Sequence, residues 1–147
     1  MIYSPMVQKA AELACLAHAH QVDKGGYPYI LHPVHLAEQT DTEEECIVAL
    51  LHDIVEDTWV SFNFLKGMGF SEKILDALFA LTKEKDEPYS HYIARVKKNP
   101  LALKIKILDL QHNLDVARMR GCNLPNGQIQ SLQKRYLNAL QYLLSNA

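Results

Sequence analysis

The stretch Ile47-Val48-Ala49-Leu50-Leu51-His52-Asp53-Ile54-Val55-Glu56-Asp57-Thr58 runs five apolar residues into a His-Asp pair, and a Glu-Asp pair follows one helical turn later. At about 100° per residue on an α-helix, His52 would lie beneath Glu56 and Asp53 beneath Asp57, all within an arc of roughly 140°. Three carboxylates crowded around an imidazole next to a buried turn are costly unless a cation lies among them. The pattern therefore favours a metal ion, with His52 and Asp53 as adjacent ligands.

A second polar group interrupts the apolar segment 100–120. Asp109, His112 and Asn113 are spaced at i, i+3 and i+4, which places them on one face of a helix. The rest of the segment is so apolar that we expect this helix to be central and buried nearly all round. A buried carboxylate is costly without a partner, so Asp109 either bonds to a neighbouring helix or arginine or is a further metal ligand. Because a metal site is already predicted at His52 and Asp53, the role of metal ligand is favoured for Asp109.

The other histidines offer further nitrogen ligands. A mononuclear site with oxygen and nitrogen ligands needs about four protein groups and open positions for water. His32 lies where a loop enters a helix, and His35 follows one turn later. Position in the sequence favours His32 only slightly over His35. His18 and His20 lie near the end of the first predicted helix.

The composition is that of one domain with its own core, which we place over residues 1–147. Hydrophobic residues make up 48% of the 147, and the net charge of −2 includes no basic run, which argues against nucleic-acid binding. The three cysteines give no disulfide framework. The start of the chain has no signal-type apolar run, and the longest apolar run, 47–51, is too short to span a bilayer. We expect a cytoplasmic protein with no membrane partner.

Caps and breaks divide the chain into helices, with no alternating pattern typical of a strand. We expect helices over 5 to 17–20, 33–39, 43–55, 61–67, 72–81, 90–98, 100–120 and from 128 to the end. The fold class is therefore all-α, a single compact bundle of about seven to eight helices. The apolar face of the last helix either closes the core or forms a homodimer contact, and the sequence does not choose between them.

Four separate stretches together make up one composite motif: residues 17–21, 26–33, 49–58 and 106–113. The specific part is Pro-Tyr-Ile-x-His-Pro followed by His-Asp-x-x-Glu-Asp-Thr and a distant Asp. In these stretches the chain resembles the HD superfamily of metal-dependent phosphohydrolases, and more closely the hydrolase domain of RelA/SpoT-type alarmone enzymes and the small stand-alone alarmone hydrolases. The resemblance implies an HD-type helical domain that removes the 3′-pyrophosphate from (p)ppGpp with the help of Mn²⁺.

By motif position, the resemblance also implies a role for each site residue. The metal would be held by His32, His52, Asp53 and Asp109. The catalytic acidic pair would be Glu56 and Asp57, and the residues facing the nucleotide would be Lys24, Tyr29 and Asn113. Positive charge near the phosphates would come from Lys24 and Lys106. Mn²⁺ suits mixed imidazole and carboxylate ligands better than Zn²⁺ does, and another divalent metal stays an open alternative.

Two positions depart from the family pattern. Asp23 stands where a basic residue usually precedes the lysine that matches Lys24, and Asp115 stands where an arginine often follows the asparagine that matches Asn113. Each change puts a negative charge near a polyanionic substrate, which is worth on the order of a few kcal/mol in a partly dry cleft. The substrate, rather than the metal chemistry, is what these positions put in question.

The leading hypothesis is therefore a metal-dependent phosphohydrolase in which an activated water attacks (p)ppGpp. One alternative keeps this chemistry and changes the substrate to another phosphorylated nucleotide, such as a nucleoside phosphate or NADPH. Another is a non-catalytic HD module that binds a metal or a nucleotide, against which the pair Glu56-Asp57 argues because a pure binder has no use for it. The simplest alternative is a helical bundle whose polar core groups satisfy one another, and it predicts no bound metal.

Overall fold

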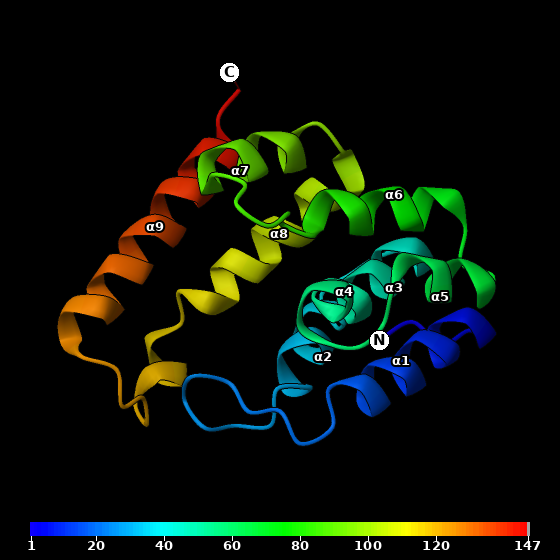
Figure 1. Ribbon diagram of the computed structural model, residues 1–147, viewed down its shortest axis with the longest axis horizontal. Helices are drawn as coiled ribbons and strands as arrows, with labels where there is room; N and C mark the ends of the chain where they lie inside the picture. Colours follow the sequence, from blue (N-terminus) through cyan, green and yellow to red (C-terminus); the bar gives the residue numbers. More distant parts are fainter. Residues whose placement is uncertain (147) are drawn as a thin grey trace.

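The computed structural model describes residues 1–146, and these form an all-α bundle, which confirms the predicted fold class (Figure 1). The helices are α1 (Pro5–Ala17), α2 (Leu31–Ala37), α3 (Glu43–Leu51), α4 (Ile54–Asp57), α5 (Phe62–Gly67), α6 (Glu72–Leu81), α7 (Tyr89–Lys97), α8 (Pro100–Asn113) and α9 (Asn126–Leu144), with a 3₁₀ helix η1 (Val116–Met119) before α9. An isolated antiparallel bridge between Val22 and Pro28 closes the loop before α2. No helix in this part of the chain is both long enough and apolar enough to cross a bilayer.

Five of the predicted helices begin with a side-chain cap. In each, the side-chain oxygen of the cap accepts a hydrogen bond from the backbone N–H three residues later. The five capping residues are Ser4, Thr42, Ser61, Ser71 and Asn99. Proline in the first turn of α1 and α8 costs nothing, because that turn has no intrahelical partner for an N–H group. Local sequence thus determines where these helices start.

α8 is central, as the sequence predicted, because it packs against α2, α3, α6, α7 and α9, but the most fully buried helix is α3. Every residue from 45 to 51 is buried, and α3 packs against α1, α2, α6 and α8. In α8 the buried residues are Ala102, Ile105, Asp109 and Leu110. The expectation that α8 is buried nearly all round is wrong, because one of its sides faces a cleft instead of another helix.

The predicted continuous helix over 43–55 is also wrong, because the chain turns at His52 and Asp53 between α3 and α4. The backbone of Asp53 has φ −107° and ψ 3°, outside the α-helical region. The Nδ1 of His52 lies 2.8 Å from the carbonyl oxygen of Ala49, the group that a continuing helix would bond to the N–H of Asp53. The regular stacking of His52 under Glu56 is therefore absent.

The helix predicted to reach residue 120 ends at Asn113 instead. The Asp115 carboxylate accepts a hydrogen bond from the N–H of Ala117 and begins η1. Arg118 then folds back, and its Nη1 donates to the carbonyl oxygen of His112 at 3.0 Å. These side-chain bonds satisfy groups at the end of α8 that a longer helix would have paired internally.

Two glycines let the segment after α8 lie directly against the loop 22–28. A Cβ at Gly25 would lie 2.0 Å from the carbonyl oxygen of Arg118, and a Cβ at Gly121 would lie 2.9 Å from the carbonyl oxygen of Gly25. No side chain fits at either position without moving backbone. This backbone contact places Arg118 beside the loop.

The apolar face predicted for the last helix is divided between the core and the surface. Ala139 and Leu143 of α9 are buried, whereas Leu137 and Leu144 are exposed. α9 packs against α7 and α8 (Figure 1). The face therefore closes one side of the bundle, and its use in a homodimer stays a prediction.

The loop between α6 and α7 is held by a buried carboxylate. Glu87 accepts bonds from Nε and Nη2 of Arg95, both at 3.0 Å, and lies 2.6 Å from Nδ1 of His91. The hydrogen bonds from Arg95 lower the pKa of Glu87 from its ordinary value to about 2, although desolvation by burial opposes them. The carboxylate thus favours the folded state wherever it is ionised.

We predict that Glu87→Gln lowers the free energy of unfolding at pH 7 by about 1.5–3 kcal/mol, the range for hydrogen bonds to charged groups. Because the folded pKa of Glu87 is depressed, its contribution is complete above the pKa of the unfolded chain and is lost as the pH falls from about 4.5 towards 2. Urea unfolding of both proteins at pH 7, 5 and 3 measures this. A difference that grows on acidification would contradict the prediction.

Candidate active site

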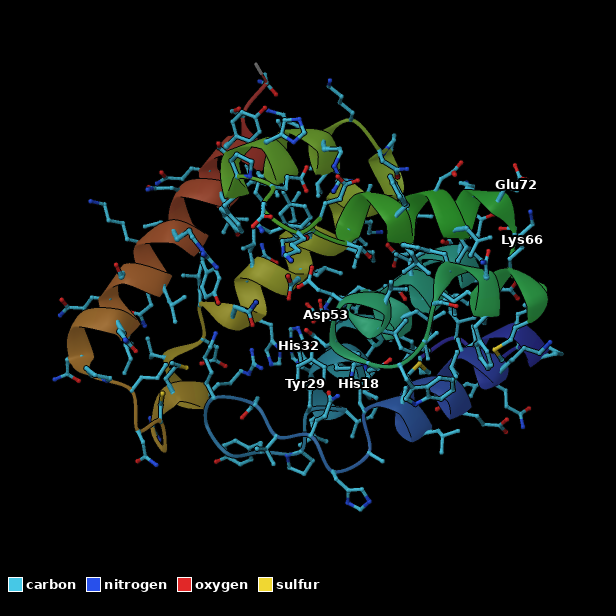
Figure 2. The ribbon with its side chains drawn as sticks, in the orientation of Figure 1. His18, Tyr29, His32, Asp53, Lys66 and Glu72 are labelled. Carbon is cyan, nitrogen blue, oxygen red and sulfur yellow. The ribbon has the colours of Figure 1, made fainter. Side chains whose placement is uncertain are left out.

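Three buried side chains from different helices meet at the centre of the bundle. His32 comes from α2, His52 from the turn after α3 and Asp109 from α8, and one ligand atom of each lies within 4.8 Å of the others. All three residues are 3% exposed. Figure 2 shows His32 in the middle of the molecule with Asp53, Tyr29 and His18 close by, whereas Lys66 and Glu72 lie at the periphery.

His52 is oriented so that one of its nitrogens lacks a hydrogen-bond partner. Its Nδ1 donates to the carbonyl oxygen of Ala49, a backbone bond that assigns the ring proton to that nitrogen. Its Nε2 is buried without a hydrogen-bond partner, 3.0 Å from a carboxylate oxygen of Asp53 and 3.6 Å from one of Asp109. In a neutral ring the lone pair of Nε2 would face two carboxylates, which is repulsive, so a proton or a divalent cation between them is favourable.

The charges in and around the cluster shift its pKa values accordingly. Burial lowers the pKa of His52, but the charges of Asp53 and Asp109 outweigh it and raise the pKa well above the ordinary value. Burial raises the pKa of Asp109, but the charge of Lys106 and the hydrogen bond with His32 hold it well below its usual range. The cluster thus stabilises positive charge at its centre, and the residues present fit a divalent metal ion.

Asp109 connects the histidines to two residues that the sequence placed near the substrate. One oxygen, Oδ1, lies 2.8 Å from Nε2 of His32 and accepts from Nδ2 of Asn113 at 3.1 Å. The other, Oδ2, accepts from Nζ of Lys106 at 2.7 Å. Lys106 and Asn113 both line the cleft, but each donates a hydrogen bond to Asp109.

Tyr29 and Asp53 form a second contact pair at the edge of the cluster. The Tyr29 hydroxyl donates a hydrogen bond to Oδ2 of Asp53, and burial, together with the neighbouring carboxylate, raises the pKa of Tyr29. His18 packs against the Tyr29 ring with centroids 4.7 Å apart. Tyr29 was predicted to face the nucleotide. It lines the cleft, but its hydroxyl donates its hydrogen bond to Asp53.

A cleft of about 750 Å³ opens over this cluster. Glu56 and Asp57 both line it and are exposed, so the acidic pair predicted from the sequence does face open space. Glu56 accepts a hydrogen bond from the backbone N–H of Lys83 at 2.9 Å, which ties α4 to the loop after α6. Partial desolvation at the mouth of the cleft and the charges of Asp53 and Glu56 raise the pKa of Asp57 to about 6.

The far wall of the cleft is aromatic and cationic. Nζ of Lys24 lies 3.3 Å from the hydroxyl of Tyr136, and the guanidinium of Arg135 lies 4.3 Å from the centroid of the Tyr89 ring. Sequence reasoning found Lys24 but missed Arg135 and Tyr136, because it considered the amphipathic α9 only as a core or dimer element. The polar residues of that helix were a signal that one side of it faces solvent or a ligand.

Asp23 does not project freely into the cleft. Its Oδ1 accepts from the N–H groups of Gly25 at 2.9 Å and Tyr27 at 3.0 Å, and its Oδ2 lies 3.5 Å from Nη2 of Arg118. Arg118 also lines the cleft and donates to the Oδ1 of Asn113 at 3.1 Å. The unfavourable charge expected at position 23 is thus paired with a cation from elsewhere in the chain.

With this geometry in view, the chain is similar in sequence to parts of several RelA/SpoT-type (p)ppGpp hydrolases and synthases. It is 32% identical over 120 residues to a guanosine-3′,5′-bis(diphosphate) 3′-pyrophosphohydrolase of Aquifex aeolicus, covering 74% of this chain and 17% of that protein. It is 33% identical over 112 residues to the bifunctional (p)ppGpp synthase/hydrolase SpoT of Escherichia coli, covering 67% of this chain and 16% of that protein. The chain therefore spans only about a sixth of the length of these relatives.

The fold has a solved counterpart of similar size. A metazoan orthologue of SpoT, described as hydrolysing ppGpp, superimposes with a TM-score of 0.80 at 21% sequence identity, covering 99% of this chain and 91% of that chain. At this identity the likeness concerns the fold. No family model matches the chain.

We predict that a divalent metal raises the thermal stability of the protein, because it binds the native cluster and not the unfolded chain. At 100 times the dissociation constant the gain is about 2.7 kcal/mol. Differential scanning calorimetry with MnCl₂ and with EDTA measures it. The shift should disappear in Asp109→Asn and persist in Asp76→Asn, which changes an exposed carboxylate on α6. Equal shifts in the two variants would place the metal elsewhere.

Proposed function

We propose that this chain is a divalent-metal-dependent phosphohydrolase that removes the 3′-pyrophosphate from (p)ppGpp. The observation that carries the proposal is the buried His32–His52–Asp109 cluster, which lies at the base of a cleft lined by Glu56 and Asp57. The relationship to (p)ppGpp hydrolases supports the choice of substrate. A small phosphorylated nucleotide is thus the proposed partner.

The proposed metal ligands are His32, His52, Asp53 and Asp109, with Mn²⁺ as the preferred ion because imidazole and carboxylate suit it. When bound, such an ion polarises a phosphoryl oxygen and lowers the pKa of a water molecule. His52 is already fixed with its Nε2 towards the two carboxylates. The Tyr29 hydroxyl orients Asp53, and Lys106 orients Asp109. The chain thereby holds its ligands in place before the ion arrives.

Glu56 and Asp57 supply the proton acceptor next to this centre. Both are open to the cleft, and Asp57 has a raised pKa, as expected for a group that takes up a proton near neutral pH. Either one positions the attacking water and receives its proton. Lys24 lies farther out and neutralises phosphate charge on the substrate.

The negative charge at position 23 gives no reason to prefer another substrate, because the contacts of Asp23 already balance it. Its carboxylate is consumed by two backbone N–H groups and Arg118. Asp115 is likewise engaged, as the cap of η1, and does not line the cleft. Hydrolysis of another nucleoside phosphate or of NADPH stays the alternative that a substrate panel tests.

We predict that the protein releases pyrophosphate from ppGpp with Mn²⁺ and that Asp53→Ala abolishes both this release and Mn²⁺ binding. Losing a ligand should cost more than the 10–100-fold typical of an outer-shell partner. Ion chromatography of the products and calorimetric titration with MnCl₂ measure the two effects. Asp76→Ala serves as the control. Pyrophosphate release that survives in Asp53→Ala would refute the ligand assignment, and phosphate release from NADPH without pyrophosphate release from ppGpp would refute the substrate.

We predict that Glu56→Gln keeps Mn²⁺ affinity but loses about 10²–10⁴-fold in kcat, the usual range for a general base. The amide oxygen of the glutamine can still accept the bond from the N–H of Lys83, so the loop stays in place. The control is Glu84→Gln, an exposed carboxylate on the same loop. A Glu56→Gln protein that no longer binds Mn²⁺ would contradict this division of roles.

A further inference from the structure

His112 contacts His32 through the nitrogen that faces away from the metal cluster. The two Nδ1 atoms lie 2.7 Å apart, and the ring planes differ by only 5° although the ring centroids are 5.0 Å apart. Parallel rings whose edge atoms are that much closer than their centroids meet edge to edge. The hydrogen bond therefore lies in the ring planes, along the direction of the nitrogen lone pair.

The direction of this hydrogen bond decides whether His32 can bind a metal. A neutral imidazole carries one N–H and one acceptor nitrogen. If His112 is the donor, the proton of His32 lies on Nε2 and is donated to Asp109 2.8 Å away, and this nitrogen has no lone pair left for a metal. If His112 accepts, the proton of His32 lies on Nδ1, and Nε2 presents its lone pair to the cluster.

A metal ligand role for His32 selects the second arrangement. When Nε2 of His32 holds an ion, that nitrogen carries no proton, so the ring proton lies on Nδ1. The Nδ1 of His112 is the atom placed to accept from it, 2.7 Å away and in the plane of the ring. Arg118 donates to the backbone carbonyl of His112 and to the side chain of Asn113, and these bonds hold this end of α8.

His35 packs on the face of the His112 ring. Their centroids are 3.9 Å apart and their planes differ by 22°, a true face-to-face stack. His35 follows His32 by three residues on α2, and His112 follows Asp109 by three on α8. One helical turn beyond each proposed ligand, the chain thus places a residue that joins α2 to α8.

We propose that His112 is a positioning residue for the metal site: its Nδ1 accepts a hydrogen bond from the Nδ1–H of His32 and so keeps Nε2 of His32 free for the ion, while His35 holds the His112 ring in place. This inference rests on the proposed metal-dependent function and extends it to two histidines outside the ligand set. A hydrogen bond to the second nitrogen of a ligating histidine fixes its tautomer and orientation, and losing such a partner typically costs 10–100-fold in metal affinity.

The test is a calorimetric titration of the metal-stripped protein with MnCl₂. His112→Phe keeps a ring against His35 but has no acceptor, and its dissociation constant should rise about 10–100-fold. His112→Asn restores an acceptor oxygen and should stay within about threefold of the parent. Gln111→Ala, an exposed neighbour on α8, is the matched control and should not change. At saturating Mn²⁺ the kcat of His112→Phe should recover, because the change affects metal retention.

Unchanged Mn²⁺ affinity in a folded His112→Phe protein would overturn the inference, and so would an equal loss in His112→Phe and His112→Asn. Should His112→Phe fail to fold, the pair His35→Ala and His35→Phe replaces it: the alanine should weaken Mn²⁺ binding and the phenylalanine should not. Mn²⁺ binding that depends on His112 in a protein inactive on ppGpp would uphold the inference and refute the proposed function. Hydrolysis of ppGpp by the parent protein, together with an unchanged Mn²⁺ affinity in His112→Phe, would uphold the proposed function and refute the inference.

Discussion

A carboxylate buried at the centre of a helical bundle is the constraint on which this structure depends. Asp109 is 3% exposed, and an ionised carboxylate at that depth is tolerated only when it is fully partnered. Its partners are His32 from α2 and Lys106 and Asn113 from its own helix, with His52 from the end of α3 within 3.6 Å. These contacts bring three helices together and, with them, the proposed ligands His32, His52 and Asp109, and Asp53 adjoins them 3.0 Å from His52.

The outline of the fold follows from local sequence. Cap residues such as Ser71 and Asn99 begin helices because their oxygens bond backbone N–H groups that a helix leaves unpaired, and this chemistry is readable without tertiary contacts. The ends of α3 and α8 were not predictable in this way. They depend on side chains that compete for backbone carbonyls: the ring of His52 at Ala49, and the guanidinium of Arg118 at His112. Hydrophobic periodicity contains no information about such competition.

The same contrast between local sequence effects and tertiary contacts applies to the candidate site. The residues that the sequence pattern singled out do come together: the carbonyl-bonded His52 beside Asp53 and Asp109, with Glu56 and Asp57 on the cleft above. Their roles stay predictions. The partners that satisfy them could not be predicted, because a single tyrosine or lysine near a ligand is equally compatible with exposure. Tyr29 and Lys106, assigned to the nucleotide by motif position, instead bond Asp53 and Asp109 in this structure.

The metal cluster and the outer wall of the cleft belong to different parts of the chain. The proposed ligands come from α2, α8 and the turn after α3, whereas the wall comes from the loop 22–28, from Arg118 after α8, and from α9. A substitution in the wall can therefore change what the cleft binds while the buried cluster is preserved. Asp23 illustrates this separation, since its charge is matched by Arg118, a residue 95 positions later, without any change among the ligands. Departures from the family pattern that are confined to the wall thus bear on the proposed recognition of a nucleotide, whereas the proposed hydrolysis depends on residues that the core itself needs.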